Sequence, residues 1–127
     1  MKILKLILRV AVSIILLQTL YFKFTGQPES IYIFSAVGME PWGRIGSGII
    51  ELVAGISLLV PAFVGIGAIL TLGTMSGAVF FHLTTLGIEV QGDGGTLFYM
   101  ALFCFFSSAW LTWTYKHQIP LIKNFFS

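Results

Sequence analysis

Residues 43–86 read GRIGSGIIELVAGISLLVPAFVGIGAILTLGTMSGAVFFHLTTL, a long apolar run with a proline near its middle. A helix needs about 20 apolar residues to cross a bilayer, so one helix of this length would be far too long to span. Pro61 lacks a backbone N–H and disfavours a continuing helix. We therefore predict two membrane-spanning helices, 43–60 and 63–86, which meet in a tight turn at Pro61-Ala62.

Two more apolar runs flank this pair, at 4–24 and 95–115, and polar loops at 25–42 and 87–94 separate them from it. Backbone groups in lipid must be satisfied within a segment, which favours helices. None of the runs shows the alternation of a barrel strand. The sequence predicts an all-α fold, an integral membrane four-helix bundle in which 1–127 form a single transmembrane domain.

The composition supports a membrane protein. Of the 127 residues, 57% are hydrophobic and 9% are charged, and the mean hydropathy is +0.95. Soluble domains carry about 25% charged residues, so the lipid bilayer is the expected surrounding of this chain. The net charge of +2 gives no reason to expect a nucleic-acid partner. The lone cysteine, Cys104, cannot form an intramolecular disulfide and is interpreted as a packing residue.

The orientation follows from where the basic residues stand. Lysine and arginine open the first predicted helix and follow the last: Lys2, Lys5, Arg9, Lys116 and Lys123. Cytoplasmic segments carry such an excess, so both termini are predicted to be cytoplasmic. The loops then lie on the outer face. Within the first of them, the apolar segment 30–38 is too short to span and is predicted to be a helix at the membrane interface.

The two outer turns resemble each other. Residues 37–46, VGMEPWGRIG, and residues 86–95, LGIEVQGDGG, coincide at a glutamate and three glycines when one is shifted by 49 positions. The match does not extend into the helices, and turns select glycine independently. Duplication of a helical hairpin and independent choice of turn residues therefore both stay open.

Ionisable and amide side chains within the spans gather in the outer half of the predicted bundle. Counting about 1.5 Å per residue from the nearest turn, Glu51 lies about 12 Å and His82 about 7 Å below the outer surface. Lys23 ends the first helix, and Gln18 lies about 7.5 Å further in. Such residues are functional candidates by default. We predict a polar pocket that opens to the outer face, with six candidate ligand-binding residues: Glu51, His82, Lys23, Gln18, Arg44 and Asp93.

Five of these six residues also have a structural interpretation. Glu51 must be protonated, paired or in a wet cavity, and a pair with Lys23 or Arg44 would be purely structural. Lys23 alternatively extends to the interface. His82 alternatively is a neutral histidine bonded to a backbone carbonyl. Arg44 and Asp93 either pair across the mouth of the pocket or stand solvated at its rim.

Glycines recur at helix-packing distances. Gly73 and Gly77 form a GxxxG motif, and Gly48 and Gly55 stand seven apart on one helix face. Small residues let helix backbones approach closely in lipid. We therefore predict that these glycines pack against neighbouring helices.

Several chemistries are excluded by the residues present. A bis-histidine haem needs two histidines at one depth, but His82 lies near the outer face and His117 near the inner end. One histidine with one glutamate is a poor metal site, and no metal motif occurs, so no metal is expected. The segment GDGG lacks the lysine of a phosphate loop. No cofactor is evident from the chain itself.

The residues resemble the DoxX-like family of small four-helix bacterial membrane proteins. The resemblance is carried by the Lys23 region, by GRIGSGIIELVAGISLLVPAFVGIGA (43–68), which places Glu51 in a glycine-rich second helix, and by FFHLTTLGIEVQGDGGTLFYMALFCF (80–105). It implies a multi-pass protein of the bacterial cytoplasmic (inner) membrane. The family takes its name from a quinone-linked sulfur-oxidation complex in which the member is a small membrane subunit. A quinone is therefore the cofactor that the resemblance suggests.

Three functional hypotheses follow. The first is an accessory subunit, possible in a quinone-linked oxidoreductase, that binds a quinone or similar amphipathic ligand in the pocket. The second is a membrane anchor or assembly factor that recruits a partner protein through Glu89 and Asp93. The third is a small-solute carrier, which would require a homo-oligomer. We favour an accessory or ligand-binding protein over an autonomous enzyme.

Overall fold

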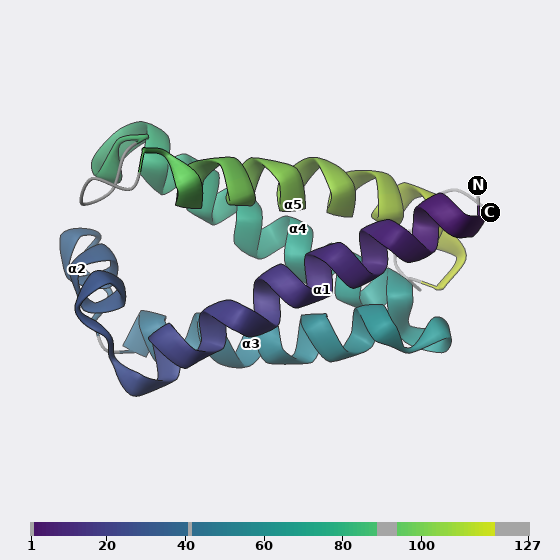
Figure 1. The fold of residues 1–127 in the computed structure, drawn as a ribbon, viewed down its shortest axis with the longest axis horizontal. Coiled ribbons are helices and arrows are strands. Elements are labelled where there is room, and N and C mark those ends of the chain that lie inside the picture. Colours follow the sequence, from purple (N-terminus) through teal and green to yellow (C-terminus); the bar gives the residue numbers. More distant parts are fainter. Residues whose placement is uncertain (1, 41, 89–93, 119–127) are drawn as a thin grey trace.

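The computed structural model describes residues 2–40, 42–88 and 94–118, and this part of the chain is helical (Figure 1). Four long helices and one short one follow each other: α1 (Lys2–Thr25), α2 (Pro28–Ala36), α3 (Trp42–Leu59), α4 (Val64–Phe81) and α5 (Thr96–Thr114). The segments α1, α3, Pro61–Leu86 and α5 are long and apolar enough to cross a membrane. The predicted all-α four-helix membrane fold is confirmed, with helix ends that differ by a few residues.

The turn at Pro61 forms as predicted. A short 3-10 turn, η1 (Pro61–Phe63), joins α3 to α4. Gln118 holds this turn from the far end of the chain, because its Nε2 donates to the Pro61 carbonyl at 2.9 Å and its Oε1 accepts from the Gly65 N–H at 2.7 Å. Arg9 Nε donates to the Leu58 carbonyl at 2.9 Å. These side chains satisfy backbone groups that helix ends leave unpaired.

The four long helices lie in two pairs. α1 packs along α3, α5 packs along α4, and α3 also packs on α4. Figure 1 shows the pairs crossing closely near the chain ends and separating toward α2. The start of α1 and the end of α5 lie at the same end of the bundle. That this end faces the cytoplasm stays a prediction, since no membrane is part of the structure.

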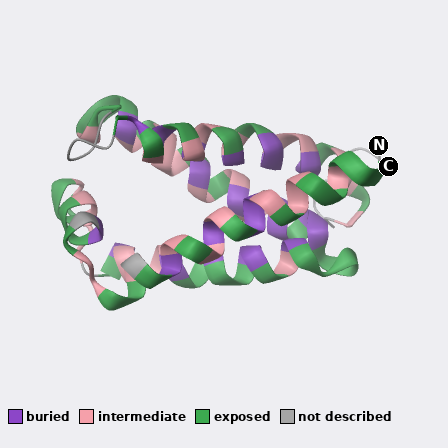
Figure 2. Cartoon of the chain, viewed as in Figure 1, coloured by how far each residue is buried: buried purple, intermediate pink, exposed green. Residues whose placement is uncertain are grey.

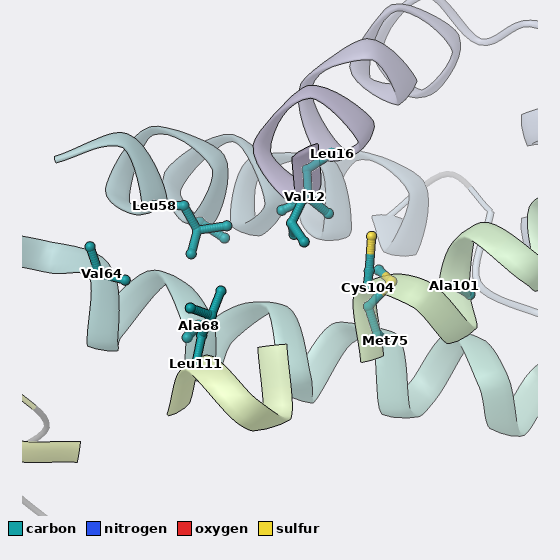
Figure 3. Close-up of a cluster of buried hydrophobic side chains, with 10 residues drawn as sticks. Val12, Leu16, Leu58, Val64, Ala68, Met75, Ala101, Cys104 and Leu111 are labelled. Carbon is teal, nitrogen blue, oxygen red and sulfur yellow. The ribbon is translucent and has the colours of Figure 1, made fainter. Parts of the chain in front are cut away.

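The apolar core fills the half where the helices cross. Figure 2 shows the buried positions turned toward the bundle interior, and Figure 3 shows side chains from all four long helices meeting there. Val12, Leu58, Ala68 and Leu111 are fully buried. Cys104 is a free, fully buried thiol within the same cluster, which confirms its interpretation as a packing residue.

The glycine predictions are half right. A Cβ added at Gly48 or Gly55 would lie 2.8 Å from side chains of α1, so these glycines permit the close α1–α3 contact. A Cβ at Gly73 or Gly77 would meet nothing within 4 Å. The GxxxG motif of α4 therefore makes no close helix contact, and that prediction is wrong. Both of its glycines face a cavity.

The two similar turns share one backbone feature. Gly38 and Gly87 both adopt positive φ, +76° and +81°. Their last aligned glycines differ, because Gly46 lies within α3 whereas Gly95 precedes α5 with a φ of +89°. Glu89 lies outside the described residues. Among the described residues the two turns share the positive φ of the first aligned glycine, and duplication stays an open alternative.

α2 covers the end where the pairs separate. The sequence predicts a short helix at 30–38, and the structure forms it at Pro28–Ala36. α2 contacts α1 and α3 on one side and the residues that follow α4 on the other. It therefore bridges the opening between the two pairs (Figure 1). Its position at a membrane interface stays a prediction.

Candidate functional site

A cavity of about 670 Å³ lies between the helix pairs, on the side of the core that faces α2. All five helices contribute to its wall, and α2 lies across the end where the helix pairs separate. Most of the wall is aliphatic, aromatic or methionine, including Ile15, Leu16, Phe34, Met75, Phe81 and Met100. Small-molecule sites typically occupy about 300–1,000 Å³ and are mostly apolar with a few polar groups. The size and lining of this cavity fit that description.

An ion pair forms the polar part of one wall. Lys23, near the end of α1, pairs with Glu51 in the middle of α3, and the Glu51 side chain is only 4% exposed. The hydroxyl of Thr19, one turn before Lys23, lies 3.2 Å from the other carboxylate oxygen and 2.8 Å from the Leu16 carbonyl oxygen, so its one proton is shared between them. A buried carboxylate requires such partners. Of the interpretations left open for Glu51, the structure shows the pair with Lys23, and all three side chains line the cavity.

Lys23 does not extend away from the bundle. Its ammonium points inward to Glu51, and the side chain is 16% exposed. The nitrogen also lies 5.9 Å from the ring centroid of Phe34, which comes from α2. The alternative in which Lys23 extends to the interface is therefore wrong. The ammonium instead links α1, α3 and the covering helix.

Arg44 lies next to this ion pair, outside the cavity lining, and contacts the backbone of Lys23. Its Nη2 lies 2.9 Å from Glu40 Oε1, and its Nη1 donates to the backbone carbonyl of Lys23. That carbonyl belongs to the last turn of α1, where a cation is favoured. Arg44 thus pairs with Glu40 and not with Glu51. The predicted partner Asp93 lies outside the described residues.

His82 approaches the cavity from the second helix pair. α4 ends at Phe81 and continues as a π-helical turn, η2 (His82–Leu86), which stops at Gly87. His82 is 5% exposed, and its Nδ1 lies 2.9 Å from the Gly87 carbonyl oxygen. Phe98 of α5 packs edge-to-face against it, with 5.4 Å between ring centroids. The predicted bond to a backbone carbonyl is confirmed, and the same ring lines the cavity.

The structure thus brings four of the six candidates together. Glu51, His82, Lys23 and Gln18 all line the cavity, although Gln18 is itself exposed. Arg44 stands beside them but outside the lining, and Asp93 is not described. Within residues 2–40, 42–88 and 94–118, no three side chains of His, Cys, Asp or Glu come together as a metal would require.

Other lining residues were missed from the sequence. Thr19 bonds to Glu51, and its position four residues before Lys23 places both on one helix face, a signal that was available. Phe34 and the glycines Gly73 and Gly77 also line the cavity. The glycines were read as packing residues because spacing alone does not tell which face of α4 meets a neighbour.

The fold and the site together define a multi-pass integral membrane protein with a polar cluster inside its helix bundle. The family model DoxX matches residues 4–84, more than half of the chain, so the protein belongs to the DoxX family. The match covers α1 to α4 and includes Lys23, Glu51 and His82, but not α5. No curated protein and no solved structure matches the chain.

Proposed function

We propose that this DoxX protein is an accessory membrane subunit that binds an amphipathic ligand, such as a quinone, in the cavity between its helix pairs. We also propose the bacterial inner membrane as its location, as the family resemblance implies. The ligand would place its ring among the apolar side chains and its polar atoms against the ion pair and the histidine.

The distribution of polarity in the cavity carries this proposal. The wall is mainly apolar, yet it holds an ion pair, Lys23–Glu51, on one side and His82 on the other. An apolar pocket with a few convergent polar groups is the usual form of a ligand site. Apolar side chains in place of Lys23 and Glu51 would give the bundle about the same free energy of folding. Stability alone therefore does not explain why an ion pair stands there.

The other two hypotheses gain no support from the described residues. Recruitment of a partner depends on Glu89 and Asp93, which lie outside them. A carrier requires an oligomer, and the structure of one chain does not bear on whether copies associate. Both stay predictions, and neither replaces ligand binding as the proposal.

Neutralising one carboxylate at a time tests the proposal. The probe is a benzoquinone with a decyl chain, titrated into lipid nanodiscs that contain the protein, with empty nanodiscs as the blank. Glu51→Gln removes the charge that holds Lys23 at the cavity wall, so the probe should bind about tenfold more weakly. Glu40→Gln also neutralises a paired carboxylate, but Glu40 does not line the cavity.

The Glu40→Gln variant should bind like the unmodified protein. A cooperative melting transition of each variant in detergent will show that both are folded, although Glu51→Gln should melt at a lower temperature because Lys23 loses its charged partner. Full-strength binding by a folded Glu51→Gln protein contradicts the proposed role of the ion pair. No binding of the probe to the unmodified protein contradicts the proposal for this ligand class.

A further inference from the structure

The tautomer of His82 is fixed by its backbone contact. A carbonyl oxygen has only lone pairs, so the 2.9 Å contact between Nδ1 and the Gly87 carbonyl requires the proton to be on Nδ1. A neutral imidazole carries one N–H only, which leaves Nε2 with a lone pair. His82 in its neutral form therefore faces a ligand as a hydrogen-bond acceptor.

The acceptor nitrogen is available to a ligand. His82 is buried and lines the cavity. In the described part of the chain, every fully buried side-chain nitrogen and oxygen has a hydrogen-bond partner. The hydrogen bond of His82 is made by Nδ1, and Nε2 makes none within the described residues. Nε2 is therefore not fully buried, and it can meet a ligand in the cavity.

The ring is held in this orientation from two sides. The π-helical turn His82–Leu86 and the positive φ of Gly87, +81°, bring the Gly87 carbonyl back toward the ring. Phe98 packs edge-to-face against the imidazole. A ring rotated by 180° would place the carbon Cδ2 at the carbonyl oxygen and lose the present hydrogen bond. π-helical turns often occur at functional sites, where they redirect a side chain.

We infer that the cavity takes a ligand with a hydroxyl group on an aromatic ring, whose O–H donates to Nε2 of His82. This inference rests on the proposed function, because it names the chemistry of the ligand in the same cavity. Aromatic lining residues such as Phe34 and Phe81 suit a ring. Across the cavity the Lys23 ammonium is a donor, which suits an acceptor oxygen on the same ligand.

A pair of probes that differ only in the O–H group tests the inference. para-Heptylphenol can donate to Nε2, whereas its methyl ether, para-heptylanisole, has the same ring and tail but no donor. Binding of each is measured in protein nanodiscs, with empty nanodiscs correcting for partition into lipid. The phenol should bind about tenfold more tightly, the usual worth of a hydrogen bond whose loss leaves a buried group unpaired.

His82→Asn is the matched variant. The asparagine amide can still donate to the Gly87 carbonyl, but it presents no atom at the position of Nε2. The preference for phenol over anisole should therefore disappear while binding of the anisole is kept. Nitrogen-15 NMR of labelled histidine gives a readout apart from binding: His82 should show the proton on Nδ1, and the Nε2 signal should shift when the phenol is added.

The possible results separate the inference from the proposed function. Equal binding of both probes, or a preference that survives in His82→Asn, overturns the inference and leaves a ligand-binding cavity in place. A proton on Nε2 in the NMR spectrum overturns it as well. If neither probe binds above the empty-nanodisc blank, both the inference and the proposed cavity function are contradicted.

Discussion

At the residue scale, the ion pair of Lys23 and Glu51 is the main polar interaction that crosses from α1 to α3 within the described residues. Glu51 is 3% exposed, and both of its carboxylate oxygens have partners, one in Lys23 and one in Thr19. Arg44 fixes the backbone of Lys23 through its carbonyl. Removal of Lys23 or of Glu51 leaves the other charge inside the bundle without its counter-charge, so we expect these two side chains to behave as a unit.

A double-mutant cycle will show this coupling. Glu51→Leu leaves a cation and Lys23→Met leaves an anion without its partner, and each change should destabilise the protein by about 3 kcal/mol. The double variant leaves neither charge and should recover most of that loss. Apparent melting temperatures in detergent measure the effect. Additive losses in the double variant would mean that the two charges are not coupled.

The same residues show how far sequence reasoning reaches at this scale. Counting helical rise placed Glu51, His82, Lys23 and Gln18 in the outer half of the bundle, and all four line the cavity. The hydrogen-bond partners of Arg44 were not predictable from the sequence. Arg44 pairs with Glu40, which precedes α3, and also donates to the Lys23 carbonyl of α1. Such contacts depend on how two elements meet, which residue spacing does not record.

At the element scale, α3 and α4 approach each other closely at Gly67, a glycine that the sequence did not single out. A Cβ added at Gly67 would lie 2.9 Å from the carbonyl oxygen of Ala54 and 2.9 Å from the backbone nitrogen of Leu58. Backbone atoms cannot move aside as a flexible side chain can. This contact follows directly on the Pro61 turn and sets the spacing of the two helices.

Gly67→Ala should therefore separate α3 from α4 and cost about 1–3 kcal/mol. Gly73→Ala in the same helix is the control: a Cβ there meets nothing within 4 Å, and the better helix propensity of alanine should give a gain of about 0.5–1 kcal/mol. Thermal unfolding in one detergent compares them. An equal loss of stability at both positions would contradict the close approach at Gly67.

The elements were predictable to different degrees. Apolar run length and Pro61 sufficed for the four spans and their turns, because bilayer thickness constrains helix length strongly. The π-helical turn at His82–Leu86 has no sequence signature, since it depends on the contact between His82 and the Gly87 carbonyl. The GxxxG motif of α4 was misread for a related reason, because its glycines face a cavity that exists only in the assembled bundle.

At the scale of the whole molecule, the bundle is packed at the chain ends and open toward α2. The family match ends at residue 84, so α5 lies outside it. Yet α5 supplies Leu97 and Met100 to the cavity wall and Phe98 to the packing of His82. The cavity is therefore complete only when the matched part of the chain and α5 are assembled together.

The orientation of the bundle is open to direct measurement. Single cysteines replace exposed residues, Lys2 and His117 at one end and Ser35 of α2 at the other, in a Cys104→Ala background. A maleimide that does not cross membranes is added to intact cells and to inverted vesicles. Lys2→Cys and His117→Cys should label only in inverted vesicles, and Ser35→Cys only in cells. The reverse pattern would contradict cytoplasmic termini.

The central claim is that the cavity holds an amphipathic ligand, and native mass spectrometry of protein released from nanodiscs made from its own membrane tests it most directly. The unmodified protein should carry a small amphipathic molecule. Gly77→Leu places a bulky side chain in the cavity and should lose it, whereas Gly46→Leu, where a Cβ also meets nothing within 4 Å but no cavity is lined, should keep it. A bare unmodified chain, or a bound molecule retained by Gly77→Leu, would contradict the claim.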